Sequence, residues 1–166
     1  TRGLMDVSIA IMEKLGVEVD TLRMVDYHVP HGVMPDMTEE GYERDEWPEL
    51  FERVKKADIL VVGSPIWLGQ MGAVTKLFLD RMYAMSSELN DKGQSIFYGK
   101  TGGNIITGNE DGAKHVAMHV LYSLQHLGYT IPPQADAAWL GEVGPGPSYL
   151  DEEANGPEKE FTQQNT

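Results

Sequence analysis

Hydrophobic residues recur along this chain with two different spacings, one typical of helices and the other of strands. Around residues 4–15, 45–56, 70–85 and 111–127, apolar side chains return every three or four positions, which predicts amphipathic helices. Between these segments lie shorter apolar runs that predict strands, at 17–25, 59–62, 101–107 and 129–140. The run over 59–62 does not alternate with polar residues, so we expect it to be buried on both faces of a sheet.

The predicted elements follow one another as helix and then strand, repeatedly. Such alternation favours an α/β fold in which helices cover both faces of a parallel sheet. Residues 27–45 interrupt this order with prolines, glycines and acidic residues, and predict a long surface loop. The sequence contains no internal repeat and no linker-like segment, so we expect residues 1–166 to form a single domain.

Charge and composition narrow the classes of function. Acidic residues outnumber basic ones 26 to 13, and the net charge of −13 disfavours binding to nucleic acid or to an anionic membrane surface. The sequence has no Cys, which excludes thiolate chemistry and cysteine-ligated metals within it. It shows neither an apolar run of about 18 residues nor a signal-peptide pattern. We therefore expect a soluble cytoplasmic domain.

Two loops stand where an open α/β sheet binds its ligands, beyond the carboxyl ends of the strands. In the first, over 63–72, Pro65 and Gly69 bracket the apolar pair Ile66 and Trp67 directly after a buried strand. Such a loop offers apolar walls and backbone N–H groups to a flat aromatic ligand. The alternative is an ordinary turn in which Trp67 packs on the core.

The second loop, over 107–112, has glycines at Gly108 and Gly112, between a predicted strand and a predicted helix. Glycines let the backbone approach a ligand closely, and the free N–H groups at a helix start favour anions or electron-rich edges. The alternative is a capping turn with Asn109 or Asp111 as the N-cap. Because two such loops follow adjacent strand candidates, we favour the ligand-binding interpretation.

The histidines form two groups. His115, His119 and His126 share one helix face, opposite an apolar face, and we expect them to face solvent or another subunit. No carboxylate joins them, so we predict no metal site. His28 and His31 lie in the acidic loop and are either solvated or catalytic, so we assign no catalytic residue. P-loop, dinucleotide-binding and Gly-x-Ser-x-Gly patterns are absent from the sequence.

The first loop and the helix that follows it resemble the flavin-contacting segment of the flavodoxin-like NAD(P)H-dependent FMN reductases. The residues that carry this resemblance are Ser64-Pro65-Ile66-Trp67-Leu68-Gly69 in the loop, and Lys76 and Asp80-Arg81 in the helix. The second loop is similar to the second flavin loop of that family. The resemblance covers nearly the whole chain and implies a flavodoxin-like three-layer sandwich with a parallel sheet of strand order 2-1-3-4-5. It also implies that FMN contacts Thr1, Pro65, Ile66, Trp67, Leu68, Gly69, Thr107, Gly108, Asn109 and Gly112.

The same resemblance implies an activity. NAD(P)H would give a hydride to N5 of the flavin, which would pass the electrons to a quinone-like or other small acceptor. Water can protonate the flavin or the product, so no side chain needs to act as an acid or base. Two alternatives stay open: a flavodoxin-type electron carrier whose acidic surface docks a basic partner, and a flavin-free interaction scaffold. Because family members often pair, we expect a homodimer or homotetramer formed through the histidine face or the 27–45 loop.

The sequence differs from the family pattern at both ends. The family begins with an apolar strand and a Ser/Thr-rich loop that cradles the FMN phosphate, and only residues 1–3 could represent the end of that loop. The family also ends with a further helix, which the sequence does not contain. We therefore expect the first strand and the last helix to belong to a chain longer than these 166 residues of 18.4 kDa.

Overall fold

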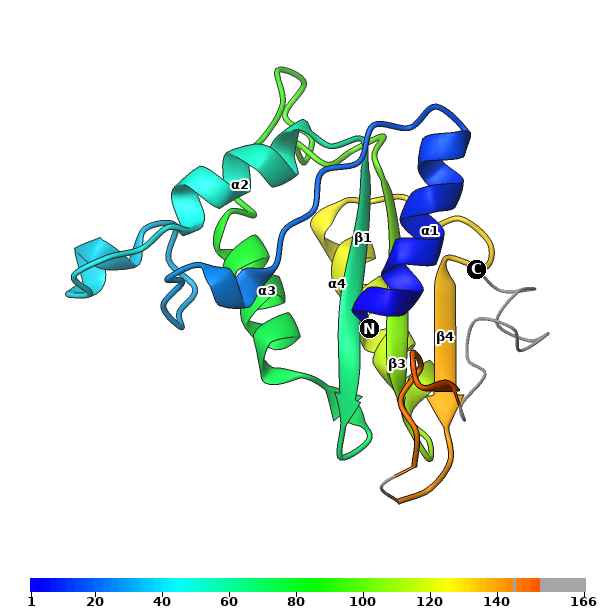
Figure 1. The fold of residues 1–166 in the computed structure, drawn as a ribbon. Coiled ribbons are helices and arrows are strands. Elements are labelled where there is room, and N and C mark those ends of the chain that lie inside the picture. Colours follow the sequence, from blue (N-terminus) through cyan, green and yellow to red (C-terminus); the bar gives the residue numbers. More distant parts are fainter. Residues whose placement is uncertain (145, 153–166) are drawn as a thin grey trace.

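A sheet of four strands forms the centre of the molecule (Figure 1). The computed structural model describes residues 1–144 and 146–152. The strands lie in the order β2-β1-β3-β4, in which β1, β3 and β4 are parallel and β2 pairs antiparallel with β1. The elements are α1 (Arg2–Lys14), η1 (Met24–Asp26), η2 (Met37–Glu40), α2 (Trp47–Lys56), β1 (Ile59–Trp67), β2 (Gln70–Met71), α3 (Ala73–Ala84), β3 (Thr101–Asn109), α4 (Ala113–Leu127) and β4 (Asp136–Gly141).

This arrangement confirms the predicted α/β three-layer fold. In Figure 1, α1 lies in front of the sheet and α4 lies behind it. The parallel strands β1, β3 and β4 are neighbours in the order that the resemblance gives to the third, fourth and fifth strands. Within the part of the chain that the structure describes, no helix is long and apolar enough to cross a membrane.

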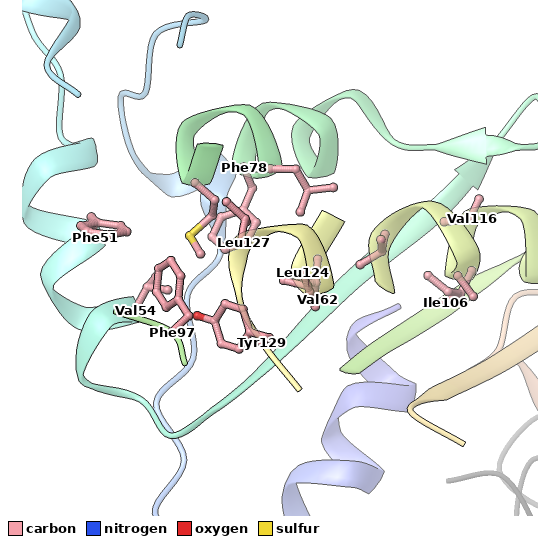
Figure 2. Close-up of a cluster of buried hydrophobic side chains, with 14 of the residues drawn as sticks. Phe51, Val54, Val62, Phe78, Phe97, Ile106, Val116, Leu124, Leu127 and Tyr129 are labelled. Atoms are coloured by element: carbon pink, nitrogen blue, oxygen red, sulfur yellow. The ribbon is translucent and has the colours of Figure 1, made fainter. Parts of the chain in front are cut away.

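Successive side chains of the central strands enter two separate hydrophobic cores. Ile105 of β3 packs with Leu4 of α1 and Trp139 of β4 on one face of the sheet. Ile106 points to the opposite face, into a larger core that is shared with α2, α3 and α4 (Figure 2). Side chains alternate between the two faces of a strand, so a continuous apolar run is what a sheet covered on both sides requires. Of the run predicted to be buried over 59–62, Val62 is buried and Leu60 and Val61 are partly buried, whereas Ile59, which begins β1, is exposed.

The helix α2 shows how the local sequence sets the limits of a helix. The Asp45 carboxylate accepts a hydrogen bond from the Trp47 N–H at 2.9 Å, just where α2 begins. Pro48 lies in the first turn, where a backbone N–H is not needed, and basic residues occupy the last turn. One stripe of the helix is buried in the larger core, as its spacing predicts: Trp47, Leu50, Phe51 and Val54.

The strand predicted over 17–25 is wrong. This segment forms no strand, and residues Met24–Asp26 form the short 3₁₀ turn η1. A strand needs the backbone of a neighbouring strand to satisfy its N–H and C=O groups, and none of the described residues pairs with this segment. Its apolar residues Leu22 and Met24 instead pack against the larger core from the side.

The structure also moves the end of the strand predicted over 59–62 and the start of the helix predicted over 70–85. β1 does not end at residue 62 but continues to Trp67, and it pairs with β2 through Ile66↔Met71 and Trp67↔Gln70. Consequently α3 begins at Ala73 rather than at Gln70. Leu68 and Gly69 form the turn of this hairpin, and both have a positive φ. Leucine seldom adopts a positive φ, so the amino-acid sequence does not indicate a turn here.

A buried ion pair fixes the long segment between η1 and α2 to the body of the protein. The Arg81 guanidinium of α3 is fully buried and contacts the Asp45 carboxylate at 2.5 Å. It also donates hydrogen bonds to the backbone carbonyls of Met34 and Pro35, at 2.8 and 3.0 Å. The Asp45 carboxylate accepts a further bond from the Met37 N–H at 3.0 Å. Burial lowers the pKa of Arg81, and the negative charge of Asp45 opposes this shift.

Removing one member of this pair is expected to destabilise the fold strongly. The substitution Asp45→Ala leaves the Arg81 guanidinium buried without its counter-charge, which costs about 3–5 kcal/mol of unfolding free energy. Urea denaturation of the purified protein measures this loss. The control is Asp80→Ala, which breaks the exposed i,i+4 pair with Lys76 and should cost less than about 0.5 kcal/mol. Equal small losses in the two variants would contradict a structural role for the buried pair.

Candidate functional site

The parallel pairing of β1 with β3 brings the two predicted ligand loops to one edge of the sheet. Their register places Pro65 beside Thr107, so both loops leave the sheet at the lower end in Figure 1. The start of α1 reaches the same edge, where the hydroxyl oxygens of Thr1 and Thr107 are 2.8 Å apart. The structure therefore brings together three residues that are distant in the sequence and predicted to contact a ligand: Thr1, Pro65 and Thr107.

The hairpin between β1 and β2 presents an apolar tip to solvent. Leu68 and Gly69 have φ values of 51° and 73°, as in the two-residue turns that connect tightly paired strands. Leu68 is fully exposed, and Trp67 exposes 68% of its surface. The alternative in which Trp67 packs on the core is therefore wrong. Large apolar side chains exposed at a sheet edge are available to pack against a ligand.

The glycines of the second loop allow the two loops to touch each other. A Cβ atom on Gly112, whose φ is +90°, would lie 2.9 Å from the Cα atom of Gly69. A Cβ atom on Gly108 would lie 2.6 Å from the Cβ atom of Ile66. The sequence predicts that these glycines give a ligand access to the backbone. In the structure, the space beside each glycine is occupied by the hairpin, so the two loops form one continuous wall.

The start of α4 carries no side-chain cap. Its N-cap residue is Gly112, and no side chain bonds to the first turn. Asn109 instead donates a hydrogen bond from Nδ2 to the carbonyl oxygen of Gly144, at 3.2 Å. The alternative in which Asn109 or Asp111 caps the helix is therefore wrong. The first N–H groups of a helix have no partner within the helix, so those of α4 are left for solvent or a ligand.

A cavity of about 550 Å³ lies where the hairpin meets the start of α4, and it is open to solvent. Its size falls within the range of small-molecule sites. Of the residues predicted to contact a ligand, Gly69 and Gly112 line it. The sequence interpretation missed other lining residues, among them Gln70 and His115, whose Oε1 and Nε2 atoms are 3.1 Å apart. The complete lining is Gly69, Gln70, Glu110, Asp111, Gly112, Ala113, Lys114, His115 and Leu140.

A network of buried hydroxyl groups holds the base of the hairpin. Ser64 is fully buried, and its Oγ atom lies 3.0 Å from Oγ1 of Thr75 in α3. The same oxygen accepts a hydrogen bond from the Gly72 N–H at 3.2 Å and donates one to the Pro65 carbonyl at 2.9 Å. Both ends of the hairpin are thereby tied to α3. The sequence interpretation did not identify this role, because a serine before a proline gives no sign of its partner eleven residues later.

The histidines fall as two separate groups in the structure. His28 and His31 are exposed on the segment between η1 and α2, which projects away from the two loops in Figure 1. The structure therefore does not bring them to the site. His115, His119 and His126 lie exposed on α4, as predicted, with the His115 and His119 rings 4.6 Å apart. Among the described residues, no group of three or more His, Asp or Glu side chains could hold a metal ion.

Removing the buried Ser64 hydroxyl is expected to loosen the hairpin. The substitution Ser64→Ala removes one of the two acceptors of the Gly72 N–H, which also bonds to the Pro65 carbonyl, and leaves the Thr75 hydroxyl with only the Gly63 carbonyl at 3.5 Å; this should cost about 0.5–1.5 kcal/mol of unfolding free energy. Chemical denaturation measures the change. Ser87→Ala, at an exposed position, serves as the control and should change stability by less than about 0.5 kcal/mol. If Ser64→Ala unfolds at the same denaturant concentration as the unsubstituted protein, the network does not stabilise the hairpin.

The parallel sheet, the two loops at its carboxyl edge and the exposed apolar tip define a flavodoxin-like α/β domain. Residues 1–140 match the family model of the NADPH-dependent FMN reductases, and the chain belongs to this family. A flavodoxin from the domain Archaea, which is 12% identical and covers 99% of this chain and 82% of its own, superposes with a TM-score of 0.59. At that identity the likeness shows the fold alone.

Closer relatives are longer proteins. The 8-demethyl-8-aminoriboflavin-5′-phosphate synthase of Streptomyces davaonensis is 38% identical over 156 residues, which cover 91% of this chain and 61% of the synthase. The crystal structure of RosB with bound 8-demethyl-8-formylriboflavin-5′-phosphate is 36% identical, with a TM-score of 0.87 over 99% of this chain and 66% of that one. The divalent metal cation transporter MntH of Mycobacterium bovis is 61% identical over all 166 residues, which make up 24% of its length.

Proposed function

We propose that this chain binds FMN across the hairpin of β1 and β2 and the 107–112 loop, and that it transfers electrons from NAD(P)H to a quinone-like or other small acceptor. The observation that carries the proposal is the exposed tip of Trp67 and Leu68, held directly beside the uncapped start of α4. Membership of the FMN reductase family supports the flavin. The bound flavin phosphate in RosB, a structure that covers 99% of this chain, supports the same ligand class.

The residues at the sheet edge fit the parts of FMN. The isoalloxazine ring is flat, apolar on its faces and polar at its edge, so it needs an apolar surface next to hydrogen-bond donors. Trp67 and Leu68 supply the apolar surface, and the first N–H groups of α4 supply donors. A phosphate is favoured at a helix start, where N–H groups and the helix dipole are directed toward it. The start of α1 beside Thr107, with the Thr1 hydroxyl 2.8 Å from that of Thr107, is suited to this end of the cofactor.

The protein's part in the reaction is to bind and to orient. When bound, the flavin supplies the hydride chemistry, accepting two electrons from the nicotinamide and returning them to the acceptor. Trp67 and Leu68 shield one side of the ring from water, and the Ser64–Thr75 network keeps their hairpin in place. The cavity lined by Gln70 and His115 leaves an open approach for the nicotinamide and the acceptor in turn. No side chain at the edge needs to move a proton, because solvent reaches the site.

Shortening Trp67 tests where the cofactor lies. Loss of ring stacking in Trp67→Ala should raise the dissociation constant of FMN about tenfold, since stacking on an aromatic side chain contributes about 1–3 kcal/mol. Fluorescence titration with FMN measures the change. Tyr98→Ala is the matched control, because Tyr98 exposes 66% of its surface but lies in the loop before β3. Equal affinities of the two variants would place the flavin away from the hairpin tip.

Steady-state oxidation of NAD(P)H distinguishes a reductase from an electron carrier. With FMN bound, the protein should oxidise NADPH or NADH in the steady state when a quinone is present, and removal of FMN should abolish the rate. The chain's net charge of −13 also suits a carrier that docks a basic redox partner. A protein that retains FMN on dialysis, but shows no turnover with either nicotinamide, is such a carrier. A protein that retains no FMN would contradict both functions.

A further inference from the structure

A hydrogen bond between His115 and Gln70 joins the two walls of the cavity. His115 lies in the first turn of α4, and Gln70 begins β2, where it pairs with Trp67 of the hairpin. Nε2 of His115 lies 3.1 Å from Oε1 of Gln70, and both residues line the cavity of about 550 Å³. The bond therefore ties an imidazole ring of α4 to the hairpin on which we place the flavin.

This bond determines which nitrogen of His115 is left for a ligand. The carbonyl oxygen of an amide only accepts hydrogen bonds, so Nε2 of His115 donates its N–H to Gln70. Such a contact orients the ring and fixes the role of the other nitrogen. That nitrogen, Nδ1, has no hydrogen-bond partner among the residues that the structure describes.

An imidazole nitrogen suits a ligand whose oxygen changes between carbonyl and hydroxyl. Nδ1 accepts a hydrogen bond from a hydroxyl when the ring is neutral, and donates one to a carbonyl when the ring is protonated. Reduction of a quinone makes this change. The nicotinamide loses a hydride, and the quinone gains its two electrons and proton together with a second proton from water, which gives the hydroquinone. His115 can therefore bond to such an acceptor both before and after its reduction.

The charged side chains of the cavity are less suited to this contact. The ammonium group of Lys114 already pairs with the carboxylate of Asp136, at 2.5 Å. Glu110 and Asp111 also line the cavity, and as carboxylates they cannot donate a hydrogen bond to a carbonyl oxygen. The amide nitrogen of Gln70 is the competing donor, and the variants below separate its contribution from that of His115.

We propose that His115 determines which acceptors this cavity takes, by bonding through Nδ1 to an oxygen of a quinone, and that Gln70 is the positioning residue that holds its ring. The proposal rests on the proposed function, because it assumes that the acceptor enters this cavity. It assigns the acceptor a chemical class, that of compounds with a carbonyl oxygen to be bonded. An acceptor such as ferricyanide, which takes electrons without this bond, gains nothing from His115.

Two matched histidine variants test the contact. His115→Leu should raise the KM for menadione, a quinone, about fivefold in the steady-state oxidation of NAD(P)H, since one hydrogen bond is lost, and should leave the KM for ferricyanide unchanged. His119→Leu makes the same change one turn further along α4, at an exposed histidine outside the cavity lining, and should alter neither value. An unchanged menadione KM in His115→Leu overturns the proposal, as does an equal loss with ferricyanide or in His119→Leu.

The role of Gln70 is tested by coupling. Gln70→Leu should raise the menadione KM in the unsubstituted background but have no further effect in His115→Leu, because a positioning residue acts only through the ring that it holds. Gln70→Glu removes the amide nitrogen but keeps an oxygen that accepts from Nε2, so it should retain most of the affinity for menadione. Additive losses, or a Gln70→Glu variant as impaired as Gln70→Leu, would show that Gln70 contacts the acceptor itself and overturn its assigned role.

A binding measurement distinguishes failure of this inference from failure of the proposed function. Isothermal titration of menadione into the protein with excess FMN needs no turnover. Weaker binding in His115→Leu, but not in His119→Leu, supports the contact even if neither nicotinamide is oxidised, a result that would overturn the reductase function alone. Turnover of menadione that His115→Leu leaves unchanged keeps the reductase and overturns the contact. A protein that binds no menadione overturns both.

Discussion

The parallel pairing of β1 with β3 is the constraint on which the site depends. Its register, from Ile59↔Thr101 to Pro65↔Thr107, sets both which side chains enter each core and where the two loops leave the sheet. A shift of one residue would exchange Ile105 and Ile106 between the two cores, so burial on both faces fixes the register. The contact between the hairpin and the 107–112 loop is thus a consequence of hydrophobic packing far from the loops themselves.

Buried polar contacts fix the positions of the segments that are neither helix nor regular sheet, which hydrophobic packing alone does not fix. The Arg81–Asp45 pair fixes the segment before α2, and the Ser64–Thr75 pair fixes the hairpin. In both cases a side chain of α3 provides the partner, and α3 itself packs against the larger core through Phe78. Each such contact requires a specific partner, because a buried charge or hydroxyl that loses its partner is costly. Because α3 is anchored in the larger core, it holds in place both the segment before α2 and the hairpin.

The sequence predicted the elements that follow from apolar periodicity. It did not predict the features that depend on a contact with a residue elsewhere in the chain. The four helices, and the strands β1, β3 and β4, follow from apolar spacing, and the two loops follow from their glycines and prolines. The apolar alternation over 17–25 was misleading, because a strand exists only beside another strand. The turn at Leu68-Gly69 was missed because leucine rarely adopts positive φ. Ser64 and Asp45 gave no signal, since each bonds to a helix that lies far along the sequence.

Charge has two different consequences for this protein at long and at short range. FMN and the nicotinamide cofactors are anions, so a chain of net charge −13 repels them at a distance. Their binding must then rest on short-range contacts, which the start of α1, the uncapped start of α4 and the apolar hairpin tip can supply without any charged side chain. Because Glu110 and Asp111 line the cavity at the ligand edge beside Lys114, the backbone N–H groups there, rather than an excess of positive side chains, have to attract an anionic ligand.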